Sequence, residues 1–218
     1  MVGLVGGRWR GCSGYLRGMF IKVCGLKTPD DVRVATDAGA DAVGFVHNTA
    51  SVRSIPLEQV AALAALVPAG VASVLVVNDL PVADAIDAAR ASGVDVLQLH
   101  GPGYGREHVA RAVASGLRVW RATSLADGDD LRVGAFGEEA LLLDSAVPGS
   151  GETWDLSGLA EPPHGHWLLA GGLSPVNVAD AIRAVRPWGV DVSSGVEVTR
   201  GTKGHDLIRT FVAAAREA

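Results

Sequence analysis

The sequence predicts an α/β fold, a single-domain (β/α)8 (TIM) barrel, from three observations. Short apolar runs rich in Val, Leu and Ile alternate with segments of helical periodicity, an order that demands a parallel sheet. We count eight such strand-then-helix units, which favours a closed barrel over an open sheet. The length of 218 residues, with 48% hydrophobic residues, suits one core of this kind.

The first four units are regular. The strand at Ile21–Cys24 alternates β-branched with other residues, and Gly25 and Thr28-Pro29 interrupt it before a helix that stops at Gly39. The next units repeat this pattern, with Gly93 ending the third helix. We expect strands over 21–24, 41–46, 72–77 and 95–99, followed by helices over 30–38, 57–66, 82–91 and 107–114.

The last four units are less regular. A weaker helix is predicted after the fifth strand, and a long Gly- and Ser-rich loop with at most a short helix after the sixth. We expect strands over 117–122, 140–143, 166–170 and 190–193, helices over 125–133, 174–185 and 205–215, and the long loop over 148–159.

Residues 1–18 differ from the rest of the chain. They are rich in Gly and Arg, lack periodicity, and contain no apolar stretch of the kind a secretory signal requires. We expect a disordered or non-native N-terminal extension there, and a barrel catalytic domain over 19–218. No run of about 18 apolar residues occurs, so no membrane association is expected.

The net charge and the number of cysteines limit the partners, metal sites and cellular compartment that we expect for this protein. The net charge is −5 although Arg8, Arg10 and Arg17 lie in the extension, so the body is acidic and nucleic acid is not expected as a partner. Cys12 and Cys24 give neither a disulfide framework nor metal-ligand spacing, and the six histidines form no convincing metal set. A reducing cytoplasm and a site without metal are the predictions.

Two candidate acid–base residues end strands. Cys24 is the last residue of the first strand and shares a face with Lys22, at the mouth where barrel active sites are built. Asp144 ends the apolar sixth strand, and the two side chains could face each other across a substrate for proton transfer. The alternatives are a small buried hydrophobic residue for Cys24 and a helix N-cap or turn residue for Asp144.

The loops after strands seven and eight predict a phosphate site. Gly171-Gly172 opens one loop and Ser193-Ser194-Gly195 the other, where backbone N–H groups and a short helix recurrently hold phosphate. We expect Val196-Glu197 to begin that short helix. Tight turns without a ligand are the alternative.

Other polar residues also lie at predicted strand ends. Arg53 is the only cation in the loop after strand two and suits a bidentate carboxylate contact, or else is a solvated surface residue. The remaining strand-end candidates are Asn78, Gln98, His100 and Arg121.

Six motifs in order resemble a known family. From Ile21 to the C-terminus, the chain is similar to phosphoribosylanthranilate isomerases of tryptophan biosynthesis. The six motifs are Lys22–Leu26, Ala40–Phe45, Gln98–Gly101, Leu143–Ser145, Ala170–Pro175 and Asp191–Glu197.

The resemblance implies a cofactor-free Amadori rearrangement by an aldose–ketose isomerase, an intramolecular oxidoreductase. Its substrate would be N-(5′-phosphoribosyl)anthranilate and its product 1-(2-carboxyphenylamino)-1-deoxyribulose 5-phosphate, handled by a monomer or homodimer. Asp144 would be the general acid, Cys24 the general base, Arg53 the partner of the anthranilate carboxylate, and Asp191 a supporting residue. Phosphate binding would fall to Gly171, Gly172, Ser193, Ser194 and Gly195.

Two residues depart from the family pattern. Val52 precedes Arg53 where the family usually has proline, and Glu152 adds an anion to the Gly-rich segment after strand six. We expect Glu152 to point outward.

Two other functions remain open on the sequence. A phosphate-binding barrel acting on an indole or imidazole precursor would be favoured by a lysine or paired aspartates at the ends of strands one and five, where this chain has Cys24 and Arg121. A non-catalytic phosphosugar-binding barrel would not need Cys24 or Asp144.

Deleting residues 1–18 tests the predicted boundary. Because no packing pattern precedes Met19, we expect the truncated protein to keep the melting temperature and the activity of the full chain. A folding defect on truncation would show that the extension belongs to the domain.

Overall fold

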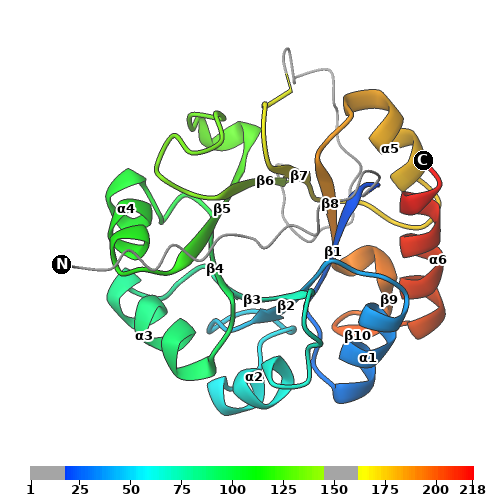
Figure 1. Ribbon diagram of the computed structural model, residues 1–218, viewed down its shortest axis with the longest axis horizontal. Helices are drawn as coiled ribbons and strands as arrows, with labels where there is room; N and C mark the ends of the chain where they lie inside the picture. The colour runs from blue at the N-terminus through cyan, green and yellow to red at the C-terminus, as the bar shows by residue number, and fades with distance from the viewer. Residues whose placement is uncertain (1–17, 145–161) are drawn as a thin grey trace.

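A closed ring of eight parallel strands forms the centre of the molecule, so the predicted barrel is confirmed (Figure 1). The computed structural model describes residues 18–144 and 162–218. The strands follow one another around the ring in chain order, and β1 pairs with β8 to close it. Their bounds are β1 Phe20–Cys24, β2 Ala42–Val46, β3 Ala72–Val77, β4 Val96–His100, β5 Arg118–Ser124, β6 Ala140–Asp144, β7 Trp167–Leu169 and β8 Gly189–Val192.

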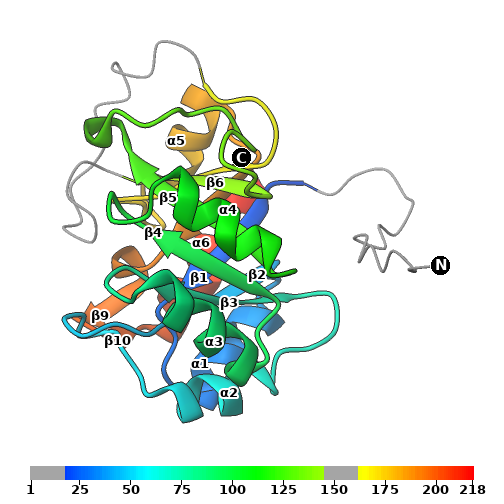
Figure 2. The ribbon, with the colours of Figure 1, turned by 90° about the vertical axis from the view of Figure 1, so that its left-hand side faces the viewer.

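Helices surround the barrel on the outside (Figures 1 and 2). Those in the described part of the chain are α1 Pro29–Asp37, α2 Leu57–Ala64, α3 Val82–Ser92, α4 Arg106–Ala114, α5 Val178–Val185 and α6 His205–Arg216. The start of α1 follows from its sequence: Thr28 and Asp31 form a reciprocal capping box, with Pro29 at the first turn.

Alternation along the strands creates two packed layers. Outward residues such as Val23, Phe45 and Leu75 pack under the helices, while inward residues such as Val74, Leu142 and Leu168 fill the barrel. All six are at most 1% exposed, so the barrel interior is a solid core rather than a channel. Its end residues are therefore the ones that meet solvent or ligand.

The predicted helix over 125–133 is wrong. Only a 3-10 turn forms, at Leu125–Asp127, and it ends at Gly128, which has a left-handed φ of 68°. The Asp127 carboxylate accepts hydrogen bonds from the backbone and hydroxyl of Ser124, so this acidic segment satisfies its polar groups locally instead of continuing a helix. The following loop still buries part of Leu131 and Phe136 against the outer core.

The prediction that Arg121 lies at the end of its strand is wrong. Arg121 lies in the middle of β5, which continues to Ser124, and its side chain is only 1% exposed. Arg121 Nη2 lies 3.0 Å from Glu138 Oε1, and its guanidinium stacks over Phe136 at 4.2 Å. Arg121 therefore anchors the loop that replaces the missing helix.

Smaller differences concern the last three units. Helix α5 begins at Val178 rather than 174, because the Asn177 side chain binds the N–H of Ser174 and the carbonyl of Gly172 and holds an open turn. After β8 a short 3-10 helix spans Ser194–Val196, whereas Glu197, predicted to lie in that helix, begins strand β9 Glu197–Thr199. Strand β9 pairs with β10 Thr202–Lys203 in a small hairpin. The predicted loop over 148–159, Glu152 and residues 1–17 lie outside the described residues.

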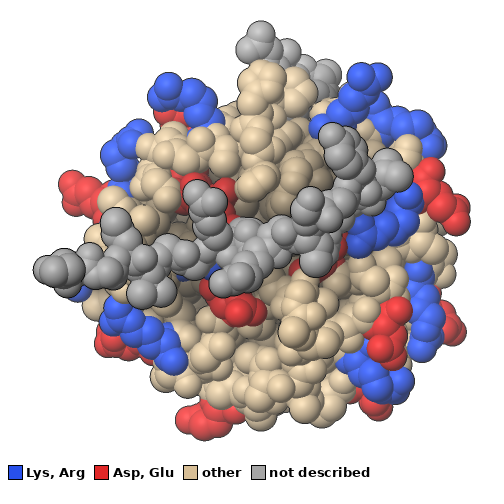
Figure 3. All heavy atoms as spheres, viewed as in Figure 1, with Lys and Arg blue, Asp and Glu red and all other residues tan. Residues whose placement is uncertain are grey.

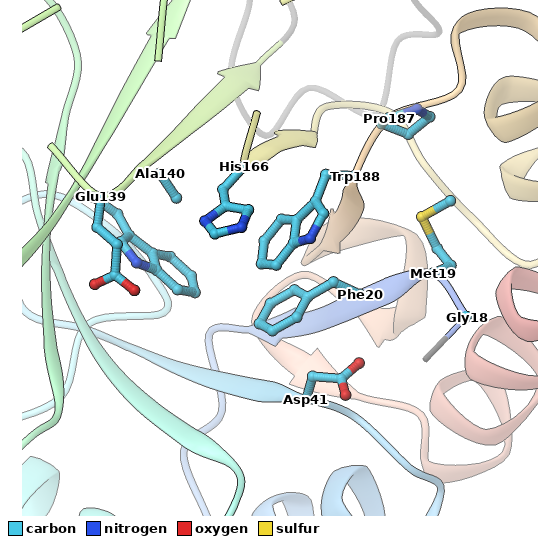
Figure 4. Close-up of a pocket in the computed structure, with 10 residues that line it drawn as sticks. Gly18, Met19, Phe20, Asp41, Glu139, Ala140, His166, Pro187 and Trp188 are labelled. Carbon is cyan, nitrogen blue, oxygen red and sulfur yellow. The ribbon is translucent and has the colours of Figure 1, made fainter. Parts of the chain in front are cut away.

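An aromatic cavity of about 600 Å³ lies at the end of the barrel where the strands begin. Phe20 and Trp188 stack there with ring centroids 4.3 Å apart, and His166 lies 4.5 Å from Trp188 (Figure 4). The carboxylates of Asp41 and Glu139 also line this cavity (Figure 4). It contains none of the candidate acid–base residues, which gather at the other end.

The surface carries both signs of charge. In Figure 3, Lys and Arg side chains are interspersed with Asp and Glu around the rim of the visible face. Within residues 18–144 and 162–218, no helix is long and apolar enough to span a membrane.

Candidate active site

A cavity of about 310 Å³ opens where the barrel strands end. This is the end at which TIM barrels bind their ligands. Side chains from six strands and from the loops after β2, β3, β8 and β9 meet in it. The lining residues are Cys24, Val46, Asn48, Ala50, Ser51, Arg53, Val76, Asn78, Gln98, His100, Asp144, Asp191, Ser193 and Arg200.

Cys24 reaches this cavity because its neighbour on β2 has no side chain. Cys24 pairs in register with Gly44, and a Cβ added at Gly44 would lie 2.7 Å from Cys24 Sγ and 3.2 Å from Cys24 Cα. The contact with Sγ is too short to occur between unstrained atoms, and the contact with Cα is unusually tight. Gly44 thus creates the space that the thiol occupies, a role that the sequence alone does not reveal.

Lys22 lies one step deeper in the barrel on the same face. Its side chain is fully buried, and Nζ donates to both carboxylate oxygens of Asp191 at 3.0 Å. The register brings the pair together, since Lys22 on β1 lies opposite Asp191 on β8. Burial alone would lower the pKa of Lys22, but the charge of Asp191 raises it above its ordinary value, so the ammonium is retained.

The thiol of Cys24 experiences opposing effects. Burial raises its pKa, and the negative charge of Asp191 adds to the rise. The ammonium of Lys22 is the largest effect in the other direction, followed by that of Lys203. The pKa of Cys24 stays above that of an ordinary thiol, so the thiolate, once formed, is a strong base.

Asp144 at the end of β6 and His100 at the end of β4 lie near each other in the cavity that Cys24 also lines. His100 Nε2 lies 3.6 Å from Asp144 Oδ2, which is longer than a hydrogen bond. Burial and the positive charge of Lys22 lower the pKa of His100, so the imidazole is neutral at physiological pH. The sequence predicts that His100 lies at a strand end, but the proximity of His100 to Asp144 depends on the tertiary fold.

Arg53 is held by an acid that the sequence did not identify as its partner. Glu197 accepts from Arg53 Nε at 2.6 Å and from Nη2 at 3.0 Å, and also from Lys203 Nζ at 3.0 Å and the N–H of Gly201 at 2.9 Å. The Glu197 side chain is only 4% exposed. Although burial would raise the pKa of Glu197, these partners lower it to about 2.

The loops after β7 and β8 touch through a glycine. A Cβ at Gly195 would lie 1.8 Å from the carbonyl oxygen of Leu173, so only glycine permits this approach. Gly171 and Gly172 have left-handed φ values of 84° and 64°. Lys203 Nζ donates to the carbonyl of Ser193 at 2.8 Å, which adds a positive charge beside these loops.

The structure brings most sequence-predicted residues to one end of the barrel. Cys24, Arg53, Asp144, Asp191 and Ser193 line a single cavity. Asn78, Gln98 and His100 line it as well, whereas Gly171, Gly172, Ser194 and Gly195 belong to the two adjoining loops and do not.

The functional residues that the sequence did not reveal are mainly buried charged groups. Lys22 and Lys203 are buried and ion-paired, and Arg200 adds a second cation to the cavity wall. Gln98, one of the predicted strand-end residues, lines the cavity, and its buried Oε1 has no hydrogen-bond partner among the described residues. In the part of the chain that the structure describes, no group of three or more His, Cys, Asp or Glu residues is arranged to hold a metal ion.

Comparison with known proteins gives one consistent answer. Residues 21–214 match the family model of N-(5′-phosphoribosyl)anthranilate (PRA) isomerase. The N-(5′-phosphoribosyl)anthranilate isomerase of Haloferax volcanii is 41% identical over 210 residues, which cover 91% of this chain and 93% of that protein.

Solved structures agree with this assignment. TrpF from Jonesia denitrificans is 52% identical with a TM-score of 0.85, covering 91% of this chain and 97% of that one. A phosphoribosyl anthranilate isomerase in complex with reduced 1-(o-carboxyphenylamino)-1-deoxyribulose 5-phosphate is 31% identical with a TM-score of 0.76. It covers 92% of this chain and 100% of that one.

Substituting Gly44→Ala tests the packing around the thiol. The added methyl group meets Cys24 Sγ, so we expect a loss of about 1–3 kcal/mol in the free energy of unfolding, measured in urea. In a Cys24→Ala background the same substitution should cost less, because the closest atom is gone. An equal cost in both backgrounds would contradict the proposed contact.

Substituting Glu197→Gln tests the ion-paired cluster. The pKa of Glu197 is about 2 in the folded protein and 4.5 in its ordinary state. Its carboxylate therefore stabilises the fold above about pH 4.5, and this contribution is lost as the pH falls towards 2. We expect the stability difference between wild type and Glu197→Gln to narrow as the pH falls through this range.

The control for this measurement is Glu58→Gln, at an exposed position on α2. It should change the free energy of unfolding by less than about 0.5 kcal/mol at any of these pH values. A pH-independent difference for Glu197→Gln would mean that its charge does not stabilise the fold.

Proposed function

The chain belongs to the N-(5′-phosphoribosyl)anthranilate isomerase family, and we propose that it isomerises N-(5′-phosphoribosyl)anthranilate in tryptophan biosynthesis, with Cys24 and Asp144 as its proton-transfer groups. The observation that carries the assignment of these two residues is their position: the last residue of β1 and the last residue of β6 line one cavity. A general base and a general acid on different strands can act on two atoms of one bound sugar.

The reaction begins with Asp144 as general acid. Its carboxylic proton passes to the ribose ring oxygen as the bond from that oxygen to C1′ breaks. The nitrogen lone pair then forms the C1′=N bond of a Schiff base, and Asp144 is left as a carboxylate. His100, neutral and 3.6 Å from Asp144, keeps a polar group beside the carboxylate after it loses its proton.

Cys24 then acts as general base. Its thiolate removes the proton from C2′. The electron pair of that C–H bond forms the C1′=C2′ bond while the π pair of the C1′=N bond passes to the nitrogen, which gives an enolamine. Tautomerisation to the ketone gives 1-(2-carboxyphenylamino)-1-deoxyribulose 5-phosphate. The electrons are only redistributed within the substrate, so the proposed chemistry requires no cofactor. The raised pKa of Cys24 implies that activity increases as the pH rises and the thiolate forms.

The two ends of the substrate would be held by different loops at this end of the barrel. The loops carrying Gly171-Gly172 and Ser193–Gly195 would bind the phosphate through backbone N–H groups, with Lys203 nearby. Because Glu197 binds the Nε–Nη2 edge of Arg53, a substrate carboxylate is expected at the edge that includes Nη1. Such contacts with non-reacting groups would fix the ribose between acid and base.

Asp191 would support the site indirectly. Both of its carboxylate oxygens bind Lys22, so we assign it to holding that ammonium rather than to a direct hydrogen bond with the sugar. We also place the enzyme in the cytoplasm, where a reducing environment keeps Cys24 a free thiol.

Replacing each proton-transfer group tests this mechanism. We expect Cys24→Ala and Asp144→Asn each to lower kcat by roughly 10²–10⁴, because each removes one proton-transfer group while the phosphate and carboxylate contacts remain. KM should therefore change much less than kcat. The assay follows the fluorescence change as the anthranilate nitrogen changes its bonding.

The control is Cys12→Ala, which removes the only other cysteine and should leave turnover unchanged. Near wild-type kcat in Cys24→Ala would remove Cys24 as the base. Retained activity of Asp144→Asn at neutral pH would assign the acid to another group.

A further inference from the structure

Lys22 is a charged residue in a place where an apolar one would fit. Its neighbours on the inward face include Phe20 and Ala42, and its side chain has no exposed area. Burying an ion pair costs several kcal/mol per ion, and replacing such a pair by apolar residues is often neutral or stabilising. The proton-transfer steps above do not use Lys22 directly, so its charge calls for another explanation.

The geometry relates this charge to the thiol. Lys22 and Cys24 are two residues apart on β1, so both side chains point into the barrel and follow one another towards its mouth. Asp191 fixes the ammonium from the side of β8 with two hydrogen bonds of 3.0 Å. The ammonium is therefore held in one place, directly below the thiol.

Charged groups from every side of the cavity act on Cys24. Cations come from Lys22 on β1, Lys203 on β10 and Arg53 in the loop after β2. The anion Asp191 lies on β8, while Asp144 on β6 and neutral His100 on β4 line the far side.

These cations differ in what else they bind. Arg53 and Lys203 are both paired with Glu197, and Lys203 also donates to Ser193. Lys22 is the cation whose effect on the thiol is largest, and it outweighs the opposing effect of Asp191. The larger effect on the pKa of Cys24 distinguishes Lys22 from Lys203, the other buried lysine.

We propose that Lys22 is a positioning residue that stabilises the thiolate form of Cys24, and that Asp191 serves this purpose by holding the Lys22 ammonium in place. The proposal rests on the proposed role of Cys24 as general base. When the thiolate takes the substrate proton it becomes neutral, and Lys22 keeps its own proton because Asp191 remains beside it. The pair thus favours the basic form of Cys24 without exchanging protons with the substrate.

The test measures the ionisation of Cys24 directly. In a Cys12→Ser background, Cys24 is the only thiol, and its alkylation rate by iodoacetamide as a function of pH reports the thiolate fraction. The ultraviolet absorbance of the thiolate gives a second readout. Neither measurement requires turnover, so the result is separable from the proposed isomerase activity.

Lys22→Met should move the midpoint of this titration upward by about 1–3 pH units, the usual effect of losing an opposite charge at close range. Lys22→Arg should restore most of the wild-type midpoint. The pH profile of kcat/KM should shift with the alkylation midpoint. Lys203→Met is the matched control, because it also removes a buried ammonium, and it should shift the midpoint less than Lys22→Met.

Lys22→Met leaves the Asp191 carboxylate buried without its partner and risks misfolding. Lys22→Met/Asp191→Asn removes both charges and should still titrate above wild type, because the effect of Lys22 exceeds that of Asp191. An unchanged midpoint in the double variant, or equal shifts in Lys22→Met and Lys203→Met, would overturn the proposal. If the expected shifts occur but Cys24→Ala remains active, the ionisation effect stands and the general-base assignment fails.

Discussion

The ion pair between Lys22 and Asp191 lies between β1 and β8, the two strands whose pairing closes the barrel. Closure therefore creates the pair, since these residues are 169 positions apart and meet only when the last strand joins the first. The pair fixes the charge below Cys24 at the same time. Barrel closure and the electrostatic environment of the thiol are thus parts of one structural event.

A second cluster connects the cavity wall to the end of the chain. Glu197, which directly follows the 3-10 helix after β8, binds Arg53 from the loop after β2 and Lys203 from the β9–β10 hairpin. This one carboxylate joins the β9–β10 hairpin, in which Glu197 and Lys203 are paired, to the loop after β2. Because Lys203 also binds Ser193, the carboxylate and phosphate ends of the proposed substrate site are positioned by a single connected network.

Much of this arrangement follows from local sequence. The apolar runs and the Gly and Pro residues after them predicted all eight strands, and the strand-end rule for barrels selected Cys24 and Asp144. Asp191 was selected only by the family resemblance. Errors arose where tertiary contacts override local pattern. The helix expected near Leu125 is replaced by a loop that Arg121 and Glu138 anchor, and nothing in the local sequence specifies that pair.

Long-range pairing explains the residues that were missed. Glu197 lies 144 positions from Arg53, so sequence spacing gives no indication of the contact. Gly44 is similar, because its importance depends on the strand register that places it opposite Cys24. A glycine in an apolar strand indicates that another group packs closely against the backbone there, but the sequence alone does not identify that group.

The aromatic cavity where the strands begin is separated from the thiol by the buried inner layer that includes Val74, Leu142 and Leu168. These side chains are at most 1% exposed and fill the barrel axis between the two cavities. A packed layer therefore separates the chemistry at one end from the medium at the other. The aromatic end is a place where a reporter group or stabilising substitutions can be introduced without altering the solvation of the reacting sulfur.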